Sequence, residues 1–196
     1  MKKIIGFCFI MMIVNGCAVT ENETKKKEIA IIDEAFMSVI DTLPYRYHSL
    51  RPAPNDTVYK SLDTLYVAIT PKLLSIRKWK HDILNVLSKR SGEDSEKYKK
   101  LLYKSDSDSA EIPLPVSYLT HTGRYKLFPY TKRTISIDTL SAIGKIEFSR
   151  VYYDSDNAIL ITTIRDHIKN GVVKLLILKK TSSQWVKTEE FILEIW

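Results

Sequence analysis

The chain has 196 residues, with 30 Lys and Arg against 23 Asp and Glu, and a formal charge of +7. This mild basic excess falls well short of the charge pattern of a nucleic-acid-binding protein, so we expect no nucleic-acid partner. Both cysteines, Cys8 and Cys17, lie near the start, and the chain from Ala18 onward has no thiol. That part of the chain is therefore excluded from forming an internal disulfide, a thiolate metal site or a cysteine nucleophile.

The first sixteen residues have the pattern of a secretory signal. Lys2 and Lys3 form a basic start, and the eleven residues Ile4 to Val14 are an apolar run interrupted only by Gly6. A membrane-spanning helix needs roughly 20 apolar residues, so this run is too short to span, whereas its length suits the apolar part of a cleaved signal peptide.

The stretch Val14-Asn15-Gly16-Cys17 resembles the lipobox of bacterial lipoproteins, with a branched residue three positions before the cysteine and a small residue just before it. Asn15 departs from the small or branched residue usual at that position. The resemblance implies that residues 1–16 are removed, that a diacylglycerol thioether forms on Cys17, and that the new amine is acylated, for example with palmitate. Several acyl chains hold a protein stably on a membrane. The alternative is a plain signal peptide with a chance cysteine.

Cleavage before Cys17 would remove two lysines and no acid, leaving 28 basic against 23 acidic residues, or +5. Ala18 directly after the cysteine resembles the sorting pattern of outer-membrane lipoproteins, so we expect a lipid anchor in the bacterial envelope at the outer membrane. Residues 17–27 read as the lipidated cysteine and a polar tether. Lys25, Lys26 and Lys27 would be attracted to anionic head groups by about 1 kcal/mol each, or would form an ordinary solvated surface.

Apolar residues at three- and four-residue spacing predict a helix over 28–43, whose stripe includes Ile29, Ile32, Phe36, Val39 and Leu43. Pro44 ends it. The irregular stretch 44–64 is rich in Tyr, Arg and His, which makes it our candidate ligand-binding loop. Its candidate contacts are Tyr45, Arg46, Tyr47, His48 and Arg51. Such residues also cover core edges in ordinary loops.

Residues 65–70 read as a strand that Pro71 interrupts, because proline cannot donate to a sheet. Helices are predicted over 77–90 and over 93–104, the second with Tyr98, Leu101 and Leu102 facing inward. A polar loop over 106–111 follows.

The second half has the pattern of strands. Short strands are predicted at 118–121, 124–128 and 134–137, and longer ones at 145–153, 158–165, 172–180 and 184–195. Their separators are Asp154-Ser155-Asp156-Asn157, Asn170-Gly171 and Thr181-Ser182-Ser183, and Asn-Gly between such runs is a strong hairpin signal. Connections this short join antiparallel neighbours.

Together these elements predict one α+β domain over 28–196, an N-terminal helix packed on a curved antiparallel β-meander, with a short helical insert. This order, with Gln184-Trp185-Val186-Lys187 entering the last strand, loosely resembles small cystatin-like and nuclear-transport-factor-like lipoproteins. The resemblance covers mainly 145–196 and contains no functional motif, so it implies the fold alone.

No motif in the chain predicts a metal, a cofactor or a catalytic centre. The histidines are His48, His81, His121 and His167, and no two have ligand spacing. Asp106, Asp108 and Glu111 lack the glycine and distant glutamate of a calcium loop. Asp154, Asp156 and Asn157 suit a turn. Serine-hydrolase motifs and phosphate-binding glycine loops are absent.

Three functions remain open. The first is a non-enzymatic, membrane-tethered binding or accessory module that contacts a ligand or another envelope protein. The second is an immunity-type lipoprotein that neutralises a toxin in the periplasm, for which adjacent toxin genes would be the sign. The third is an envelope hydrolase, which would need close carboxylates or a His–carboxylate pair in a cleft.

Overall fold

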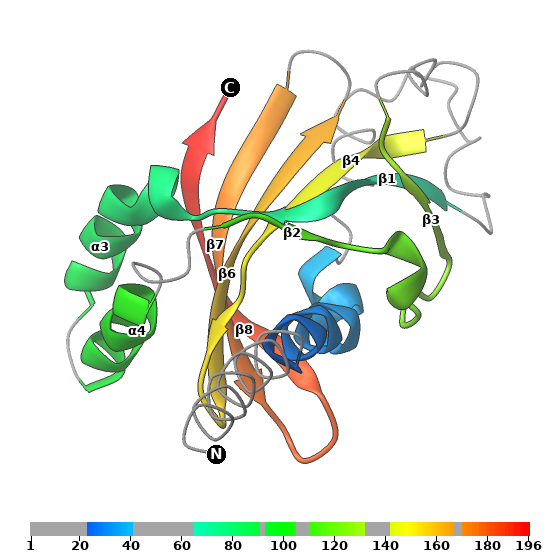
Figure 1. The fold of residues 1–196 in the computed structure, drawn as a ribbon. Coiled ribbons are helices and arrows are strands. Elements are labelled where there is room, and N and C mark those ends of the chain that lie inside the picture. The colour runs from blue at the N-terminus through cyan, green and yellow to red at the C-terminus, as the bar shows by residue number, and fades with distance from the viewer. Residues whose placement is uncertain (1–22, 41–64, 91–92, 105–109, 132–141, 167–169) are drawn as a thin grey trace, which may run out of the picture.

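The computed structural model describes residues 23–40, 65–90, 93–104, 110–131, 142–166 and 170–196, and it places a mixed sheet between helices on both faces (Figure 1). A helix over residues 23–40 comes first. The strands are β1 (Leu65–Leu74), β2 (Ile112–Pro113), β3 (Tyr125–Pro129), β4 (Ala142–Ser149), β5 (Tyr152–Tyr153), β6 (Asn157–Asp166), β7 (Asn170–Lys180) and β8 (Trp185–Ile195). The remaining helices are η2 (Arg77–Trp79), α3 (Lys80–Ser88), α4 (Glu93–Tyr103) and η4 (Val116–Tyr118).

The sheet confirms the α+β class but is not wholly antiparallel. Its main order is β2-β1-β4-β6-β7-β8, and the run from β4 to β8 is antiparallel as the short connections predict. β1, however, is parallel to both β3 and β4, so the expected antiparallel meander is wrong for this side of the sheet. Long connections that contain the helical insert separate β1 from β3 and β4, and connections of that length permit parallel pairing.

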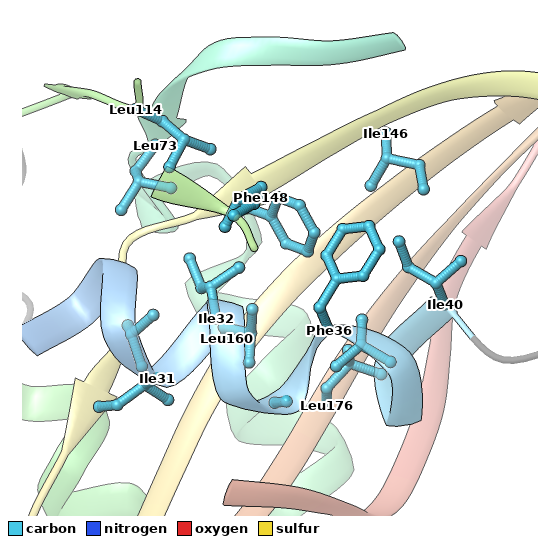
Figure 2. Close-up of a cluster of buried hydrophobic side chains, with 14 of the residues drawn as sticks. Ile31, Ile32, Phe36, Ile40, Leu73, Leu114, Ile146, Phe148, Leu160 and Leu176 are labelled. Carbon is cyan, nitrogen blue, oxygen red and sulfur yellow. The ribbon is translucent and has the colours of Figure 1, made fainter. Parts of the chain in front are cut away.

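The first face of the sheet packs on helix 23–40. Phe36 of this helix is fully buried, and its ring lies 6.4 Å from those of Tyr125 and Phe148. Figure 2 shows the helix side chains directed into the same cluster as residues from several strands. The labelled residues of this core are Ile31, Ile32, Phe36, Ile40, Leu73, Leu114, Ile146, Phe148, Leu160 and Leu176. The predicted packing of the N-terminal helix on the sheet is confirmed.

The second face packs on α3 and α4, which confirms both helices of the insert. Tyr98, Leu101 and Leu102 of α4 are buried, as predicted, and join a second core with Ile159 of β6 and Leu175 of β7. β6 and β7 are thus covered by helices on both faces. This double burial explains why 158–164 and 172–178 carry apolar residues at successive positions.

The described part of helix 23–40 already includes residues 23–27, five residues before the predicted start at 28. The reason is Glu28, which is 1% exposed and forms an ion pair with Arg150, itself 3% exposed. Arg150 Nη2 lies 2.7 Å and Arg150 Nε 2.8 Å from the Glu28 carboxylate, and the Val151 amide donates to it at 3.0 Å. This contact holds the first turns of the helix on the sheet. Because Arg150 turns toward Glu28, the predicted strand 145–153 is split into β4 and β5.

Two further expectations are wrong. β1 continues through Pro71 to Leu74, because the pairing with β4 shifts register between Ile69 and Leu73. A bulge of this kind leaves a residue without a ladder partner, which is a position that proline tolerates. The predicted strand at 118–121 is instead the end of η4 and an extended loop. The predicted strand at 134–137 lies outside the described residues.

Candidate functional site

The cleft that we take as the candidate site opens on the second face of the sheet, where α3 and α4 no longer cover it. It has a volume of about 330 Å³, at the lower end of the range for small-molecule sites. We call it the tryptophan cleft; its lining residues are Leu74, Ser75, Lys78, Trp79, Glu111, Glu147, Phe148, Ser149, Ile161, Thr163, Arg165, Glu194 and Trp196.

One side of the tryptophan cleft is Trp79, the last residue of η2. This short helix forms where the Trp79 amide donates to the Ile76 carbonyl at 2.8 Å, with Ile76 buried beneath it. The Lys78 ammonium lies 4.2 Å from the centre of the Trp79 ring. The Trp79 ring is partly buried. Its aromatic face already forms a cation–π contact with the Lys78 ammonium.

A second tryptophan of the lining, Trp196, rests on Gly171 of β7. The backbones of the two residues exchange hydrogen bonds at 2.9 and 3.1 Å. A Cβ on residue 171 would lie 2.4 Å from Trp196 Cζ2, so only glycine leaves room for the indole. The prediction that Asn170-Gly171 forms the hairpin turn is wrong. Both residues belong to β7 and pair with Asp166 and Arg165, and Gly171 serves the contact with Trp196.

The base of the cleft is a network around Glu147 of β4. Lys145 Nζ lies 2.8 Å from Glu147 Oε1, and the Thr70 hydroxyl donates to the same oxygen at 3.1 Å. Arg165 Nη2 lies 3.6 Å from Glu147 Oε2, and the guanidinium also lies 5.2 Å from the centre of the Trp196 ring. Glu147 thus orients Arg165, and Arg165 in turn covers the second tryptophan.

Thr163 lies in the base of the cleft with an unused hydroxyl. The residue is 7% exposed, and its side chain lines the cleft beside Ile161 and Arg165 on the same face of β6. Among the described residues its hydroxyl has no hydrogen-bond partner. Of the side-chain nitrogen and oxygen atoms described, only Arg90 Nη1 is buried without a partner. The Thr163 hydroxyl is therefore reachable from the cleft and available to a bound molecule.

The chemistry of the cleft favours binding over catalysis. Its described lining contains no histidine or cysteine, and Glu147 is already engaged by Lys145, Thr70 and Arg165. The lining offers the indole rings of Trp79 and Trp196 and the hydroxyl of Thr163. It also offers planar charged groups of both signs, such as Glu147 and Arg165. This combination of apolar surface with a few oriented polar groups is typical of small-molecule binding sites.

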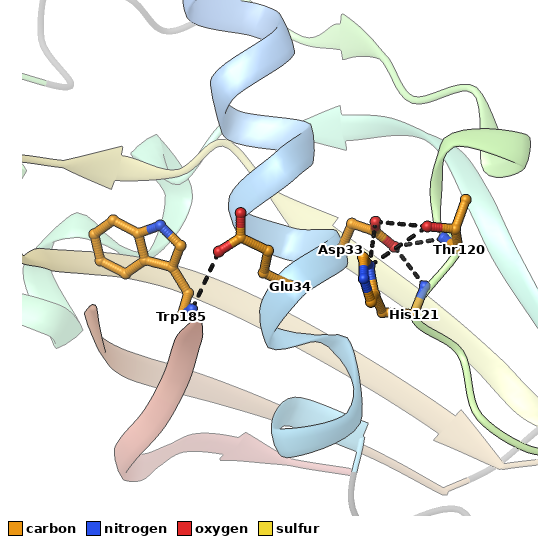
Figure 3. Close-up of polar contacts among 5 residues, drawn as sticks. All are labelled: Asp33, Glu34, Thr120, His121 and Trp185. Carbon is orange, nitrogen blue, oxygen red and sulfur yellow. Dashed lines mark hydrogen bonds and ion pairs between the residues drawn. The ribbon is translucent and has the colours of Figure 1, made fainter. Parts of the chain in front are cut away.

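A His–carboxylate pair does exist elsewhere, between His121 and Asp33 of helix 23–40 (Figure 3). His121 Nδ1 lies 2.7 Å from Asp33 Oδ2, and Asp33 also accepts bonds from the His121 amide and from the amide and hydroxyl of Thr120. Burial by itself raises the pKa of Asp33, but the hydrogen bonds from His121 and Thr120 outweigh it and lower the pKa below its usual value. The His121 side chain is 66% exposed, so the pair lies on open surface.

We interpret the Asp33–His121 pair as a contact that holds the helix in place rather than as an acid–base centre. Glu34, next to Asp33, accepts the Trp185 amide at 3.3 Å on the other side of the helix, as Figure 3 shows. Adjacent carboxylates therefore hold the helix to the loop before β3 and to the start of β8.

A second hollow, of about 410 Å³, lies beside the Glu28–Arg150 pair and includes Lys104 and Tyr153. Burial, with a smaller contribution from the charge of Glu28, raises the pKa of Tyr153. Glu28 and Arg150 are already paired with each other. Arg150 also donates to the Ala110 carbonyl at 2.9 Å. We therefore interpret this hollow as structural.

The other residues singled out from the sequence are placed as follows. Cys17 and the candidate ligand contacts Tyr45, Arg46, Tyr47, His48 and Arg51 lie outside the described residues, as does His167. His81 is exposed on α3. Asp154 accepts the amides of Asp156 and Asn157 at 2.8 Å each, which confirms that 154–157 form a turn.

Across the described segments, no group of three or more His, Cys, Asp or Glu side chains could hold a metal ion. Nor is any helix in these segments long and apolar enough to cross a membrane.

The tryptophan cleft was not predicted from the sequence, although the residue pattern of β6 indicates it. Its successive apolar residues give way to Thr163 and Arg165 at alternate positions, which share one face of a strand. The polar side chains of Thr163 and Arg165 indicate that α3 and α4 no longer cover this face of β6. Nothing in the sequence indicates that Trp79 and Trp196, more than a hundred residues apart, flank this face.

Comparisons of the chain with protein-family models, with curated proteins and with solved structures give no match.

Proposed function

We propose that the chain is a lipoprotein of the bacterial envelope, anchored through lipid on Cys17, which binds a small ligand in the tryptophan cleft and does not act as an enzyme. The observation that carries the binding function is the Thr163 hydroxyl, which has no partner among the described residues and lines a cleft that also includes Trp79 and Trp196. The anchor is supported by the lipobox-like Val14-Asn15-Gly16-Cys17.

The start of helix 23–40 adds to this proposal. Five residues separate Cys17 from residue 23, and the six Cα–Cα steps between them span at most about 20 Å. A lipid on Cys17 would therefore keep the domain close to the membrane surface. A binding domain held there meets ligands and partner proteins of the same membrane, which suits an accessory role in the envelope.

The anchor is tested by metabolic labelling with an alkyne analogue of palmitate in bacteria that produce the full chain. We expect label on the wild-type protein, recovery of the protein in the membrane fraction, and loss of both with Cys17→Ser. Mass spectrometry that finds Met1 retained, or residue 17 unmodified in the mature protein, would remove the anchor from the proposal.

The binding function is tested separately, with the low-molecular-weight extract of the same bacterial envelope as the probe. A ligand that binds only the folded state raises its melting temperature. We expect the extract to raise the Tm of the full chain and to leave that of the Trp196→Ala variant unchanged. Equal shifts for both proteins, or no shift for either, would contradict a binding function for the cleft.

A further inference from the structure

We propose that the ligand of the tryptophan cleft is a neutral saccharide, whose ring packs on the exposed part of the Trp196 indole beside the Arg165 guanidinium and whose hydroxyls bond to Thr163 and Arg165. This inference rests on the proposed binding function and names its ligand class. It follows from the charges that line the cleft, from its aromatic surface, and from its hydrogen-bonding groups.

The charges of the cleft disfavour an anion. Glu111, Glu147 and Glu194 line it against two cations, Lys78 and Arg165. Both cations are engaged, since Lys78 lies over Trp79 and Arg165 lies between Glu147 and Trp196. Glu111 and Glu147 are likewise already paired, with Lys72 at 2.6 Å and with Lys145 at 2.8 Å. An entering carboxylate or phosphate would therefore have to displace existing ion pairs or cation–π contacts to reach a cation of the lining.

The same contacts disfavour a cation. An ammonium or guanidinium group binds a tryptophan by lying over the face of its ring. At Trp79 that position holds the Lys78 ammonium, and at Trp196 it holds the Arg165 guanidinium. A cationic ligand would be repelled by the protein's own cations at both rings. The lining therefore selects a ligand without net charge.

The remaining surface suits a molecule that is apolar on one side and rich in hydroxyls on the other. Trp196 is 41% exposed and offers indole surface that its seat on Gly171 holds in place. The Thr163 hydroxyl can both donate and accept, whereas a carboxylate only accepts and a guanidinium only donates. Arg165 has the planar, paired N–H groups that form two parallel hydrogen bonds, whereas Glu147 is already engaged by Lys145 and Thr70. A sugar ring has C–H groups on its faces and neighbouring hydroxyls at its rim, and so matches all of these groups.

The test is binding of the full chain to an array of saccharides, followed by titration in solution. The protein is kept in lauryldimethylamine oxide, a detergent without a sugar head group. The array carries neutral monosaccharides, neutral oligosaccharides, uronates, sulfated sugars and amino sugars. Binding to monosaccharides indicates a free sugar as the natural ligand, and binding to oligosaccharides alone indicates the end of a polysaccharide chain.

We expect neutral sugars to bind the wild type and Trp196→Ala to weaken binding about tenfold or more, since an aromatic contact contributes on that order. Tyr118→Ala is the matched control, because Tyr118 is 59% exposed and lies outside the cleft lining; its affinity should equal that of the wild type. Circular dichroism and the Tm establish that both variants are folded.

Three results would overturn the assignment. A preference for uronates, sulfated sugars or amino sugars that Trp196→Ala abolishes would show that the cleft binds charged ligands, and would leave the binding function standing. Neutral-sugar binding that survives Trp196→Ala would place the sugar elsewhere. Failure of every array member to bind the wild type would exclude a saccharide, and the separate Tm shift with envelope extract would then decide whether the cleft binds anything.

Discussion

The indole of Trp196 rests on Gly171, so closely that a Cβ on residue 171 would lie 2.4 Å from Trp196 Cζ2 and 2.5 Å from Cε2. Gly171 pairs with Arg165 of β6 on one side, and its backbone bonds to Trp196 on the other. The glycine is therefore a packing requirement and not a turn residue. It positions the C-terminal tryptophan against the cleft that Arg165 also lines.

Gly171→Ala should push the indole off the sheet. We expect a loss of about 1 kcal/mol in the free energy of unfolding. This value is at the low end of the cost of overpacking, because the Trp196 indole can rotate away. In a Trp196→Ala background the same change should instead stabilise by about 0.5–1 kcal/mol, since alanine is favoured over glycine in a strand. Urea unfolding of the full chain measures both. An effect of the same sign in the two backgrounds would contradict this contact.

The antiparallel run β6-β7-β8, the three amphipathic helices and the inward face of α4 could all be predicted, because each depends on the spacing of apolar residues within one segment. Pro71 shows the limit of that reasoning. Its place inside β1 depends on a bulge against β4, whose residues come some seventy positions later. The parallel pairing of β1 with β3 and β4 likewise depends on which distant segments meet.

The candidate site could not be predicted for the same reason. Trp79 reads as one more apolar residue of a helix, and Trp196 as the end of a strand. Arg150 reads as a residue within a continuous strand, although the structure pairs it with Glu28 near the other end of the chain. Ion pairs and clefts of this kind are assembled by the tertiary fold, and local periodicity does not record them.

The Glu28–Arg150 pair should be the most sensitive polar contact in the fold. Both side chains are almost fully buried, so Glu28→Ala leaves a buried guanidinium without its counter-charge, at a cost of about 3–5 kcal/mol. Replacing both residues, as Glu28→Leu with Arg150→Met, should recover most of that loss, because apolar residues need no partner. Urea unfolding measures each variant.

Glu96→Ala provides the comparison for this pair, since Glu96 bonds to Lys99 at 2.8 Å on the exposed side of α4. Its removal should leave the free energy of unfolding unchanged, because exposed pairs contribute little. A single Glu28→Ala variant that unfolds at the same urea concentration as Glu96→Ala would show that the buried pair does not stabilise the helix.

Asp33→Asn should make stability depend less on pH. The carboxylate accepts four hydrogen bonds from Thr120 and His121, and the loss of charge-assisted bonds should cost about 1.5–3 kcal/mol at neutral pH. In the folded protein the pKa of Asp33 is lowered, so its contribution is fully present above the unfolded value of about 3.9. The contribution is lost as the pH falls through the lower, folded pKa.

The difference between wild type and Asp33→Asn should therefore be constant above about pH 5 and should shrink below about pH 4. Thermal unfolding of both proteins across this range gives the difference directly. A difference that stays constant down to the lowest accessible pH would mean that the Asp33 charge contributes nothing to holding the helix.

Thr163→Val should weaken ligand binding without destabilising the fold, because it replaces only the hydroxyl by a methyl group. The Thr163 hydroxyl faces the cleft without a partner among the described residues, so replacing it with a methyl group should leave the Tm unchanged or raise the stability by up to about 1 kcal/mol. The Tm shift caused by ligand should fall at the same time, because the bond to the ligand is lost. Thr70→Val is the matched change, since the Thr70 hydroxyl donates to Glu147 at 3.1 Å and its removal should destabilise by about 1 kcal/mol. Were Thr163→Val to destabilise the protein as much as Thr70→Val does, its hydroxyl would be serving the fold, and the cleft would lose the group that most directly indicates a ligand.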